Sequence, residues 1–594
     1  MDTALTPPSA MTTPLPDQAQ AMAKPGRVVV PPRPKFLFTH AWVACLGGIL
    51  LTLGAATGGS AQSEVETYDI VVYGGTSGGV MAAVQAARMG KTAVLIEPGR
   101  HLGGLTSGGL GFVDVGDPRT IGGLARTYFH RVWQYYQADA AWKWEQKRAV
   151  RGQHPPLPPD EQTLWVVEPS VAERLFDQMV TEAGVTVVRN ERLNRAGGVE
   201  KEGQRVVGIA MESGRVFAAK VYIDATYEGD LMAAAGVSYV VGREPNSRYN
   251  ETINGIRPLP PPGRFPTRID PYRVEGDPAS GLLPRVYPDW GGKVGEGDRG
   301  VQAYNYRMCL TNVPENRVRV EKPADYDEQH YELLFRFIEA GGMEGSHFRS
   351  GPSGEFEFLK FDRVPNAKTD SNNNGYISTD FVGMNWEYPE ADYAARARIA
   401  RAHEQWQRGL LWTLQNHPRI PEATRRYYAP WGLAKDEFID NGHWPFQLYV
   451  REARRMTSDY VVTEHTALGR DVAEDPIGLG SYHMDSHAIK LFVSPDGFVS
   501  SEGGMFVHIP RPFGISYRAI VPRRGECENL LVPVCTSATH AAYGSIRMEP
   551  VFMVLGQSAA TAASLAIDRR ISLQDVPYDL LRERLLADAQ ILDW

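Results

Sequence analysis

The feature that most constrains the fold of this chain is the segment 68–100, which reads YDIVVYGGTSGGVMAAVQAARMGKTAVLIEPGR. A short β-branched run leads into a glycine-rich turn, an alanine-rich helix and a second apolar run, and this order predicts a βαβ unit. Such a turn lets the backbone approach a pyrophosphate and aims the free N–H groups of a helix N-terminus at negative charge. The segment therefore predicts a sheet with parallel strands that binds a dinucleotide.

The turn departs from the usual dinucleotide fingerprint at one position. Gly74 and Gly79 occupy the first and third glycine positions of G-x-G-x-x-G, but Thr76 stands at the second. Glu97 ends the second apolar run, where an acidic side chain accepts the ribose hydroxyls of the adenosine half. An acid at this position fits both NAD and FAD, so the choice between them depends on other segments.

Three later segments favour FAD. The run HLGGLTSGGLG at 101–111 has glycines that would lie against a flat ring and phosphates, although an ordinary surface loop is the alternative. The strand ending at Asp224 leads into a turn of small residues that can return to the nucleotide. A strand and polar turn at 530–547 precede a long helix that starts near Met548 or Glu549, and its N-terminus would stabilise negative charge on a reduced flavin. The predicted cofactor-binding residues are Gly74, Thr76, Gly79, Glu97, Gly103, Gly104, Asp224, Gly544 and Met548.

The first 65 residues have the pattern of a targeting signal. Basic residues precede an apolar run at 41–56, and Gly59-Ser60-Ala61 offers small residues for cleavage before Gln62. The uncharged stretch is also long enough to span a bilayer, so an uncleaved N-terminal anchor is the alternative. We expect cleavage, export to the periplasm or the medium, and no stable membrane insertion of the mature protein.

Charge and cysteine content exclude several classes of partner. The net charge is −8 and no Lys/Arg-rich run occurs, which argues against nucleic-acid binding. The four cysteines, at 45, 309, 527 and 535, form no CxxC pair and no zinc-like spacing. Cys527 and Cys535 could pair after export, but we expect two buried thiols.

With 594 residues, the chain is too long for one hydrophobic core to be the natural expectation. The predicted fold is α/β, with a three-layer, Rossmann-type FAD-binding domain and an inserted mixed α+β substrate or cap region. The predicted divisions are 1–65 for the signal and disordered N-terminus, 66–242 and 471–594 for the FAD-binding domain, and 243–470 for the insert. Within the insert, helices are predicted over 325–340 and 391–415. The insert also holds aromatic residues that could stack on a substrate or simply pack its core: Trp290, Tyr304, Tyr306, Trp386 and Tyr388.

Several long motifs resemble those of a known family. They include VVYGGTSGG, HLGGLTSGGLG, EPSVAERLF, IDATYEGD, QAYNYRMCLT, TDSNNNGYISTDFVGMNW, GSYHMDSH and HAAYGSIRMEPVFMVLGQSAATAA. The chain resembles the FAD-dependent oxidoreductases often labelled xanthan-lyase-like, which are related in fold to glutathione-reductase-like flavoproteins. The threonine at the second glycine position is typical of that family. The resemblance implies FAD and redox chemistry, and nothing in the sequence resembles a lyase scaffold.

Two polar motifs resemble metal sites, yet no metal is predicted. His483, Asp485 and His487 alternate, so they would share one face of a strand, but we interpret Asp485 and His487 as active-site polar groups. The run from Asp370 to Gly375 mimics the start of a calcium loop, and Phe381 replaces the glutamate expected at its twelfth position. We interpret this run as a polar turn that lines the active cleft.

The predicted catalytic residues are His487, His540, Asp485 and Arg547. Either histidine could serve as the base, although each could equally be a buried structural histidine, and Arg547 would stabilise an anion or form a structural ion pair. Asn305, Arg307 and Arg451 are weaker candidates for substrate contact. We expect hydride removal from an alcohol, sugar or amine carbon of a small-molecule or saccharide substrate, and the electron acceptor stays open. The alternatives are a fumarate-reductase-like C–C desaturase or reductase, and a carbohydrate-binding or lyase-type protein with a structural FAD.

Overall fold

The computed structural model describes residues 65–147, 162–257, 265, 267–344 and 356–594. The predicted signal peptide, its cleavage site and Cys45 lie outside these residues. Residues 62–594 form one compact unit. The boundaries predicted at 242/243 and 470/471 therefore stay predictions.

The predicted βαβ unit forms the centre of the main sheet. Strand β1 (Val65–Tyr73) is followed by helix α1 (Ser77–Arg88) and by β2 (Ala93–Glu97), which pairs with β1 in parallel. Strands β3 (Thr186–Arg189) and β6 (Val216–Asp224) extend the parallel pairing on the two sides. The carboxyl ends of β1, β2 and β6 thus meet at the same edge, which is where a parallel sheet binds its ligand.

The sheet is mixed. Its order is β3-β2-β1-β6-β5-β4, and the short β23 (Leu530–Leu531) also pairs with β6 in parallel. Strands β4 (Val199–Glu202) and β5 (Arg205–Ala210) run antiparallel to their neighbours. The Rossmann-type α/β fold is confirmed, with an antiparallel pair on one flank of the parallel strands.

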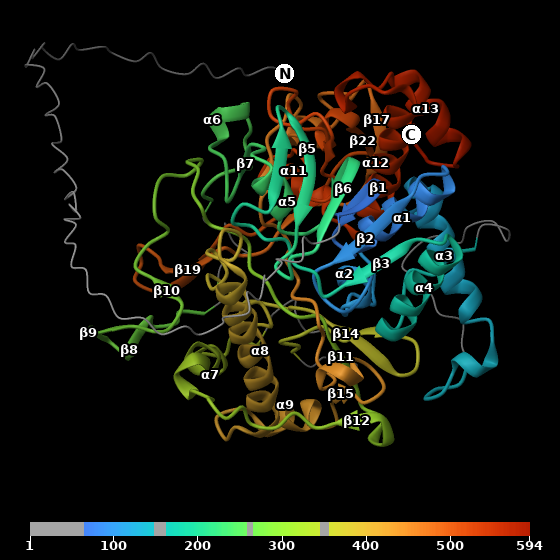
Figure 1. Cartoon of the computed structure of the whole chain (residues 1–594). Helices are drawn as coiled ribbons and strands as arrows, with labels where there is room; N and C mark the ends of the chain where they lie inside the picture. The colour runs from blue at the N-terminus through green and yellow to red at the C-terminus, as the bar shows by residue number, and fades with distance from the viewer. Residues whose placement is uncertain (1–64, 148–161, 258–264, 266, 345–355) are drawn as a thin grey trace, which may run out of the picture. The chain divides into compact units, whose positions relative to one another are not determined.

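Both faces of the central strand are buried. Ile70 and Val72 belong to one hydrophobic core, whereas Val71 and Tyr73 belong to a second. Because successive side chains of a strand point to opposite faces, the two cores lie on opposite sides of the sheet. Helix α1 and the long α12 (Glu549–Arg569) contribute to the first core (Figure 1).

Glycines allow α1 and α12 to approach closely. A Cβ at Gly556 would collide with the carbonyl oxygen of Gly78, and a Cβ at Gly78 would lie 2.8 Å from the carbonyl oxygen of Phe552. Among the described helices, only α12 has the length and hydropathy to cross a membrane, but 89% of its most apolar window is buried inside the protein. Helix α12 is thus a core helix that packs directly on α1.

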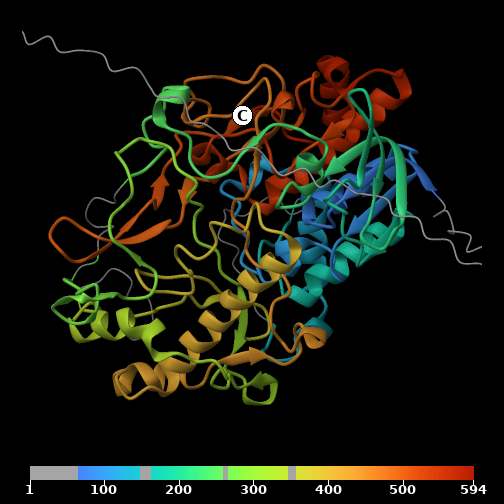
Figure 2. The same cartoon turned by 60° about the vertical axis from the view of Figure 1, so that its left-hand side comes forward.

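The region predicted as an insert contains a second sheet and several helices. Its strands follow the order β12-β15-β11-β14-β13, and all their described pairings are antiparallel. Figures 1 and 2 show this sheet and helices α7, α8 and α9 grouped at the end of the main sheet where α2 (Gly104–Ser107) lies. The bounds are Arg317–Val318 (β12), Gly432–Ala434 (β15), Met308–Thr311 (β11), Lys368–Ser371 (β14), Asp362–Val364 (β13), Glu332–Glu339 (α7), Tyr393–Asn416 (α8) and Glu422–Tyr428 (α9).

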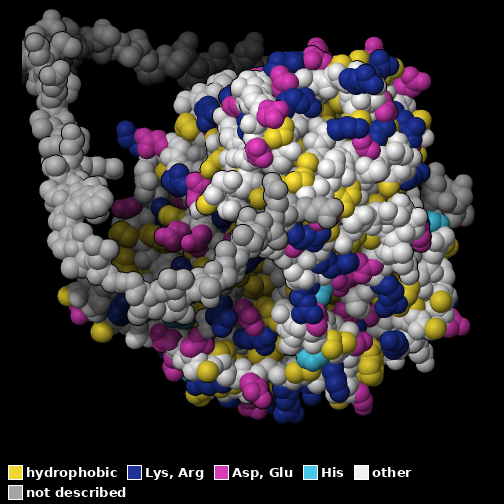
Figure 3. Space-filling model, viewed as in Figure 1, with side chains coloured by type: hydrophobic (Ala, Val, Ile, Leu, Met, Phe, Trp, Pro, Cys, Tyr) yellow, Lys and Arg dark blue, Asp and Glu magenta, His cyan; other side chains and the backbone are white. Residues whose placement is uncertain are grey.

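Of the two helices predicted in the insert, one is confirmed and the other is shorter than predicted. Helix α8 confirms the prediction over 391–415, and Asp392 caps it by accepting the N–H of Ala395 at 2.7 Å. The prediction over 325–340 is too long at its start, because residues 328–331 form a 3₁₀ turn capped by Asp327 before α7 begins. On the face seen in Figure 3, basic and acidic side chains are interspersed.

Candidate active site

The turn between β1 and α1 shows why its glycines are required. Gly74 has a φ of +105°, and a Cβ there would lie 2.8 Å from the carbonyl carbon of Ala225. A Cβ at Gly79 would collide with the carbonyl oxygen of Gly74. Thr76 caps α1, since its Oγ1 accepts the Gly79 N–H at 3.2 Å and donates to the Ala225 oxygen at 2.7 Å. The threonine thus fixes the turn to the loop that follows β6.

Glu97 lies at the predicted place, at the end of β2. Its Oε2 accepts the N–H of Gly75 at 2.7 Å, and its Oε1 accepts the N–H of Gly99 at 2.6 Å. Burial raises the pKa of Glu97 to about 7, against the opposing effect of these two N–H groups. The carboxylate therefore sits against the glycine-rich turn.

The glycine-rich segment after β2 joins the turn to the insert. The N–H of Gly103 donates to the Gly75 oxygen at 2.7 Å, and α2 (Gly104–Ser107) follows directly. A Cβ at Gly109 would collide with the carbonyl oxygen of Arg307. This segment therefore lies between the dinucleotide turn and the polar residues of the insert.

A residue that was predicted only as a possible helix start joins these parts. Glu549, the first residue of α12, accepts hydrogen bonds from the hydroxyls of Ser77 (2.6 Å), Thr106 (3.0 Å) and Tyr227 (2.7 Å). Burial raises the pKa of Glu549, while the three hydroxyls act in the opposite direction. An acid that starts a helix made mostly of small and apolar residues is the signal that could have identified it.

The remaining predicted cofactor residues support the local structure. The fully buried Asp224 accepts the N–H of Thr226 at 3.0 Å and that of Met232 at 2.8 Å, and burial raises its pKa to about 6. Met548 is the N-cap residue of α12. Gly544 lies in α11 (His540–Ile546), where a Cβ would be 2.5 Å from the Asp485 oxygen. Direct contact of these three residues with a cofactor stays a prediction.

Polar side chains from both parts of the chain meet beside this region. His487 Nδ1 lies 2.6 Å from Asp380 Oδ2, and its Nε2 lies 3.6 Å from Asp485 Oδ2. Arg547 Nη2 donates to the same Asp485 oxygen at 2.7 Å. Burial would raise the pKa of Asp485, but His487 and Arg547 lower it to about 2. Three of the four predicted catalytic residues are thus in contact.

Three guanidinium groups surround the ring of Tyr449. Their central carbons lie 4.4 Å (Arg451), 5.6 Å (Arg307) and 5.8 Å (Arg547) from the ring centroid. Arg547 Nη1 donates to the Tyr449 hydroxyl at 2.8 Å. Tyr449 was not predicted, since no local signal marks it, whereas Arg307 and Arg451 were candidates for substrate contact. Cation–π contacts of this kind stabilise a guanidinium that water does not reach.

Each of these arginines is neutralised, yet each keeps one free donor. Arg307 forms two hydrogen bonds of 2.7 Å to Asp370, and Arg451 lies 3.1 Å from Asp380. One buried nitrogen of each arginine has no hydrogen-bond partner among the described residues, namely Arg307 Nη1, Arg451 Nε and Arg547 Nε. Buried donors without an acceptor are costly, so a further acceptor beside these nitrogens would stabilise the cluster.

The backbone and side-chain geometry fits a dinucleotide. The first-turn N–H groups of α1 have no intrahelical acceptor, and Gly74 and Glu97 stand where a pyrophosphate and a ribose require them. The sequence of residues 69–585 matches the profile of the FAD dependent oxidoreductase family. The chain belongs to this family. FAD is therefore its cofactor, and binding of FAD by Gly74, Thr76, Gly79 and Glu97 stays a prediction.

Solved structures similar to this FAD-dependent oxidoreductase match it over part of its length. The myxobacterial chondrochloren halogenase CndH is 21% identical, with 30% of this chain and 41% of that chain covered and a TM-score of 0.23. The L-proline dehydrogenase from P. horikoshii is 16% identical, with 31% and 59% covered and a TM-score of 0.21. The chain spans less than two thirds of the length of either protein. No curated protein sequence matches it.

His540 has different surroundings from His487 in this FAD-dependent oxidoreductase. It starts α11 with 2% exposure, and its Nδ1 lies 2.8 Å from Glu452 Oε2. Gln302 also donates to that oxygen at 2.9 Å, and its own Oε1 accepts the N–H of His487 at 3.2 Å. The structure thus connects His540 to the cluster of His487 through Gln302.

The two metal-like motifs have other partners. Asn372 Oδ1 accepts a hydrogen bond from Asn305 at 3.0 Å, and Asp370 is bound by Arg307, so the polar turn lines the arginine cluster. The ring of His483 packs on His508 at 4.2 Å between centroids. Among the described residues, no group of three or more His, Cys, Asp or Glu side chains has the geometry to hold a metal ion.

The aromatic residues singled out in the insert mostly pack its core. Tyr304, Tyr306 and Tyr388 are buried, with at most 7% exposure. Trp386 stacks on Tyr287 with ring centroids 5.2 Å apart. The predicted substrate-stacking role is therefore not favoured for these four residues. Cys527 and Cys535 are free buried thiols, as predicted.

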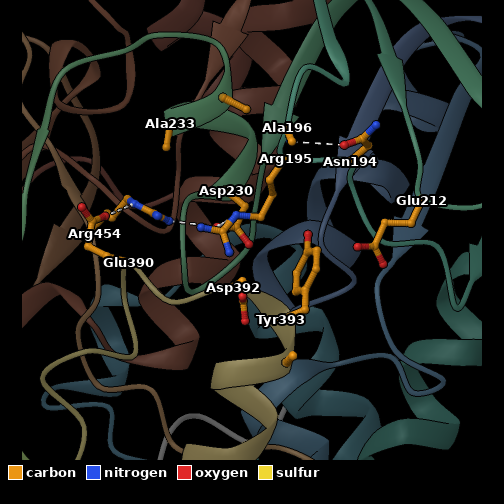
Figure 4. Close-up of a pocket in the computed structure, with 12 residues that line it drawn as sticks. Asn194, Arg195, Ala196, Glu212, Asp230, Ala233, Glu390, Asp392, Tyr393 and Arg454 are labelled. Carbon is orange, nitrogen blue, oxygen red and sulfur yellow. Dashed lines mark hydrogen bonds and ion pairs between the residues drawn. The ribbon is translucent and has the colours of Figure 1, made fainter. Parts of the chain in front are cut away.

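A separate cavity of about 610 Å³ lies beside α5 (Asp230–Ala234) and the start of α8 (Figure 4). Its charged side chains bind one another, since Asp230 accepts from Arg454 at 2.9 Å and lies 3.3 Å from Arg195. Arg454 also donates to Glu390 at 2.9 Å. Because these charged side chains are paired with one another, the candidate active site remains the cluster around His487 and Tyr449.

Proposed function

We propose that this oxidoreductase is a dehydrogenase or oxidase that removes a hydride from a carbon bearing a hydroxyl or amino group. The observation that carries this proposal is the position of His487 between two carboxylates, next to Arg547, which ends α11 just before α12 begins. The bound flavin supplies the hydride acceptor. The protein must supply a base for the O–H or N–H proton and positive charge near the flavin.

His487 is the better base of the two histidines. Asp380 holds the Nδ1 side of the ring at 2.6 Å, which favours a proton on Nδ1 and leaves the lone pair on Nε2. Asp485, 3.6 Å from Nε2, stabilises the imidazolium that forms when Nε2 takes the proton. Arg547 holds Asp485 in place and brings positive charge to the N-terminus of α12.

Anaerobic flavin reduction by candidate donors tests the proposal. In the FAD-loaded protein, H487N should slow reduction by about 10²- to 10⁴-fold, because a positioned base contributes that much. The matched control is H330N, since His330 is half-buried on its 3₁₀ turn in the insert. Equal rates for H487N and the unaltered protein would show that His487 is not the base.

We further propose that the mature enzyme acts after export on a small molecule and passes its electrons to a separate acceptor. The apolar run at 41–56 and the small residues before Gln62 support this location. N-terminal sequencing of the protein from a periplasmic or culture-medium fraction should find Gln62 at the start. A full-length N-terminus in the membrane fraction would instead support the anchored alternative.

A further inference from the structure

A two-stranded antiparallel sheet joins the candidate active site to the protein surface. Strands β18 (Met484–Ser486) and β21 (Met505–Val507) pair antiparallel, and Asp485 stands directly opposite Phe506. Directly opposite residues have their side chains on the same face, with Cβ atoms about 4.5–5.5 Å apart. The side chain of Phe506 therefore neighbours the carboxylate that contacts His487 and Arg547.

The same face carries an aromatic platform, which we define as Phe506, His483 and His508. Phe506 is 55% exposed, and its ring centroid lies 4.7 Å from that of His483 and 5.3 Å from that of His508. Both histidines hold the phenyl ring at the surface beside Asp485. An exposed apolar ring that adjoins a polar active site offers a stacking surface for a ligand.

The pairing of charges in the arginine cluster indicates which net charge a ligand can carry. Arg307, Arg451 and Arg547 are each paired with an aspartate, so the cluster has no excess of positive charge to bind a carboxylate or phosphate. Their unpartnered nitrogens can still donate to oxygen atoms. Neutral hydroxyl or ether oxygens satisfy these donors without adding negative charge beside the aspartates.

We propose that the substrate is an uncharged saccharide, whose ring stacks on Phe506 while its hydroxyl oxygens accept hydrogen bonds from the arginine cluster. A sugar ring combines the two surfaces that this site requires, since its C–H face is apolar and its rim is lined with hydroxyls. The redox step rests on the proposed function: the donor carbon loses a hydride to the flavin, and its hydroxyl loses a proton to His487, which yields a carbonyl.

The test uses the FAD-loaded enzyme and a panel of neutral mono- and oligosaccharides, the matching uronic acids, and simple amines. Neutral saccharides should reduce the flavin under anaerobic conditions, and uronic acids should reduce it at least about tenfold less efficiently. F506A should raise the half-saturating saccharide concentration about tenfold, which corresponds to a loss of about 1.4 kcal/mol of binding free energy from stacking. F506W should restore it, and W594A, which removes an aromatic ring that is 51% exposed elsewhere, should leave it unchanged.

Saccharide binding by the H487N variant separates the two proposals. Calorimetry should detect binding of the neutral saccharide to H487N as well as to the unaltered enzyme, even though H487N reduces its flavin slowly. Reduction by uronic acids or amines alone would overturn the saccharide assignment and leave the proposed function intact. Saccharide binding without flavin reduction in the unaltered enzyme would overturn the proposed function, and an unchanged half-saturating concentration in F506A would overturn the stacking platform.

Discussion

His487 and His540 are the same residue type with the same predicted role, but they differ in what surrounds them. The carboxylate beside His540 is Glu452, which also lies 2.9 Å from Arg455 Nε. Burial would raise the pKa of Glu452, but His540 and Arg455 lower it to about 2. His540 therefore belongs to a buried ion-pair network, and such networks hold segments together more often than they exchange protons with a substrate.

We expect Glu97 to make FAD binding depend on pH. The ionised carboxylate accepts hydroxyl hydrogen bonds best, and its pKa of about 7 means that FAD must displace a proton below that pH. We expect FAD affinity to rise by up to about tenfold per pH unit below pH 7 and to level off above it. Quenching of flavin fluorescence on titration into apoprotein measures this affinity.

The sign of the effect on stability is opposite in the apoprotein. Folded apoprotein binds this proton more tightly than the unfolded chain does, so the Glu97 contribution falls as the pH rises from about 4.5 to about 7. E97Q should remove both dependences, because its amide does not titrate in this range. An affinity that stays flat or falls with rising pH in the unaltered protein would contradict the assignment of Glu97 to the ribose.

At the scale of elements, glycines decide how closely helices approach their neighbours. Gly556 faces Gly78 between α12 and α1, and Gly544 faces Asp485 between α11 and β18. The first contact supports the dinucleotide turn, and the second supports the carboxylate beside His487. Added methyl groups at the two sites should therefore have different consequences.

G556A should weaken both stability and cofactor binding. The added Cβ would collide with the Gly78 carbonyl oxygen, so α12 must move away from α1, at a cost of about 1–3 kcal/mol. Urea unfolding of the apoprotein measures the loss, and FAD affinity should fall with it. G525A is the control, since a Cβ there meets nothing within 4 Å. Equal stability of the two variants would exclude close packing as the role of Gly556.

G544A should slow catalysis while FAD stays bound. A Cβ at this position lies 2.5 Å from the oxygen and 2.7 Å from the nitrogen of Asp485, so β18 must shift and carry Asp485 away from His487. Misplacement of about 1 Å can cost about 10²-fold in rate. Stopped-flow reduction of the bound flavin measures the rate, and the flavin content of the purified variant shows whether binding is kept. Loss of FAD with an unchanged rate per bound flavin would instead favour direct cofactor contact by Gly544.

Sequence reasoning succeeded where a signal is local. The βαβ unit, the start of α12 at Glu549 and the extent of α8 follow from patterns within single segments. The arginine cluster around Tyr449 could not be predicted in this way, because Arg307, Tyr449 and Arg547 are far apart in the chain. Only the fold brings them together. The partners of Glu549 could not be predicted for the same reason. Only the fold shows that Phe506 lies opposite Asp485.

At the scale of the whole molecule, a buried lysine joins the insert to the FAD-binding part. Lys368 in β14 lies 2.7 Å from Glu168, 2.9 Å from Asp436 and 2.5 Å from Glu437. Glu168 is the N-cap residue of α4 (Pro169–Glu182), on the other side of the predicted domain boundary. These carboxylates hold the pKa of Lys368 well above its usual range despite burial. One cation thus balances three acids from both parts of the chain.

K368M should destabilise both parts of the molecule together. Methionine matches the length of the lysine stem but leaves buried carboxylates without a counter-charge, which costs about 3–5 kcal/mol. Because the acids come from both parts, secondary-structure loss and FAD release should shift to lower temperature together when circular dichroism and flavin fluorescence follow the same thermal unfolding. R426M is the control, since the Arg426–Glu422 pair has side chains 71% and 69% exposed and should contribute less than about 1 kcal/mol. If FAD release kept its original midpoint while only part of the circular dichroism signal shifted, the insert would be an independent folding unit, and Lys368 would stabilise that unit alone.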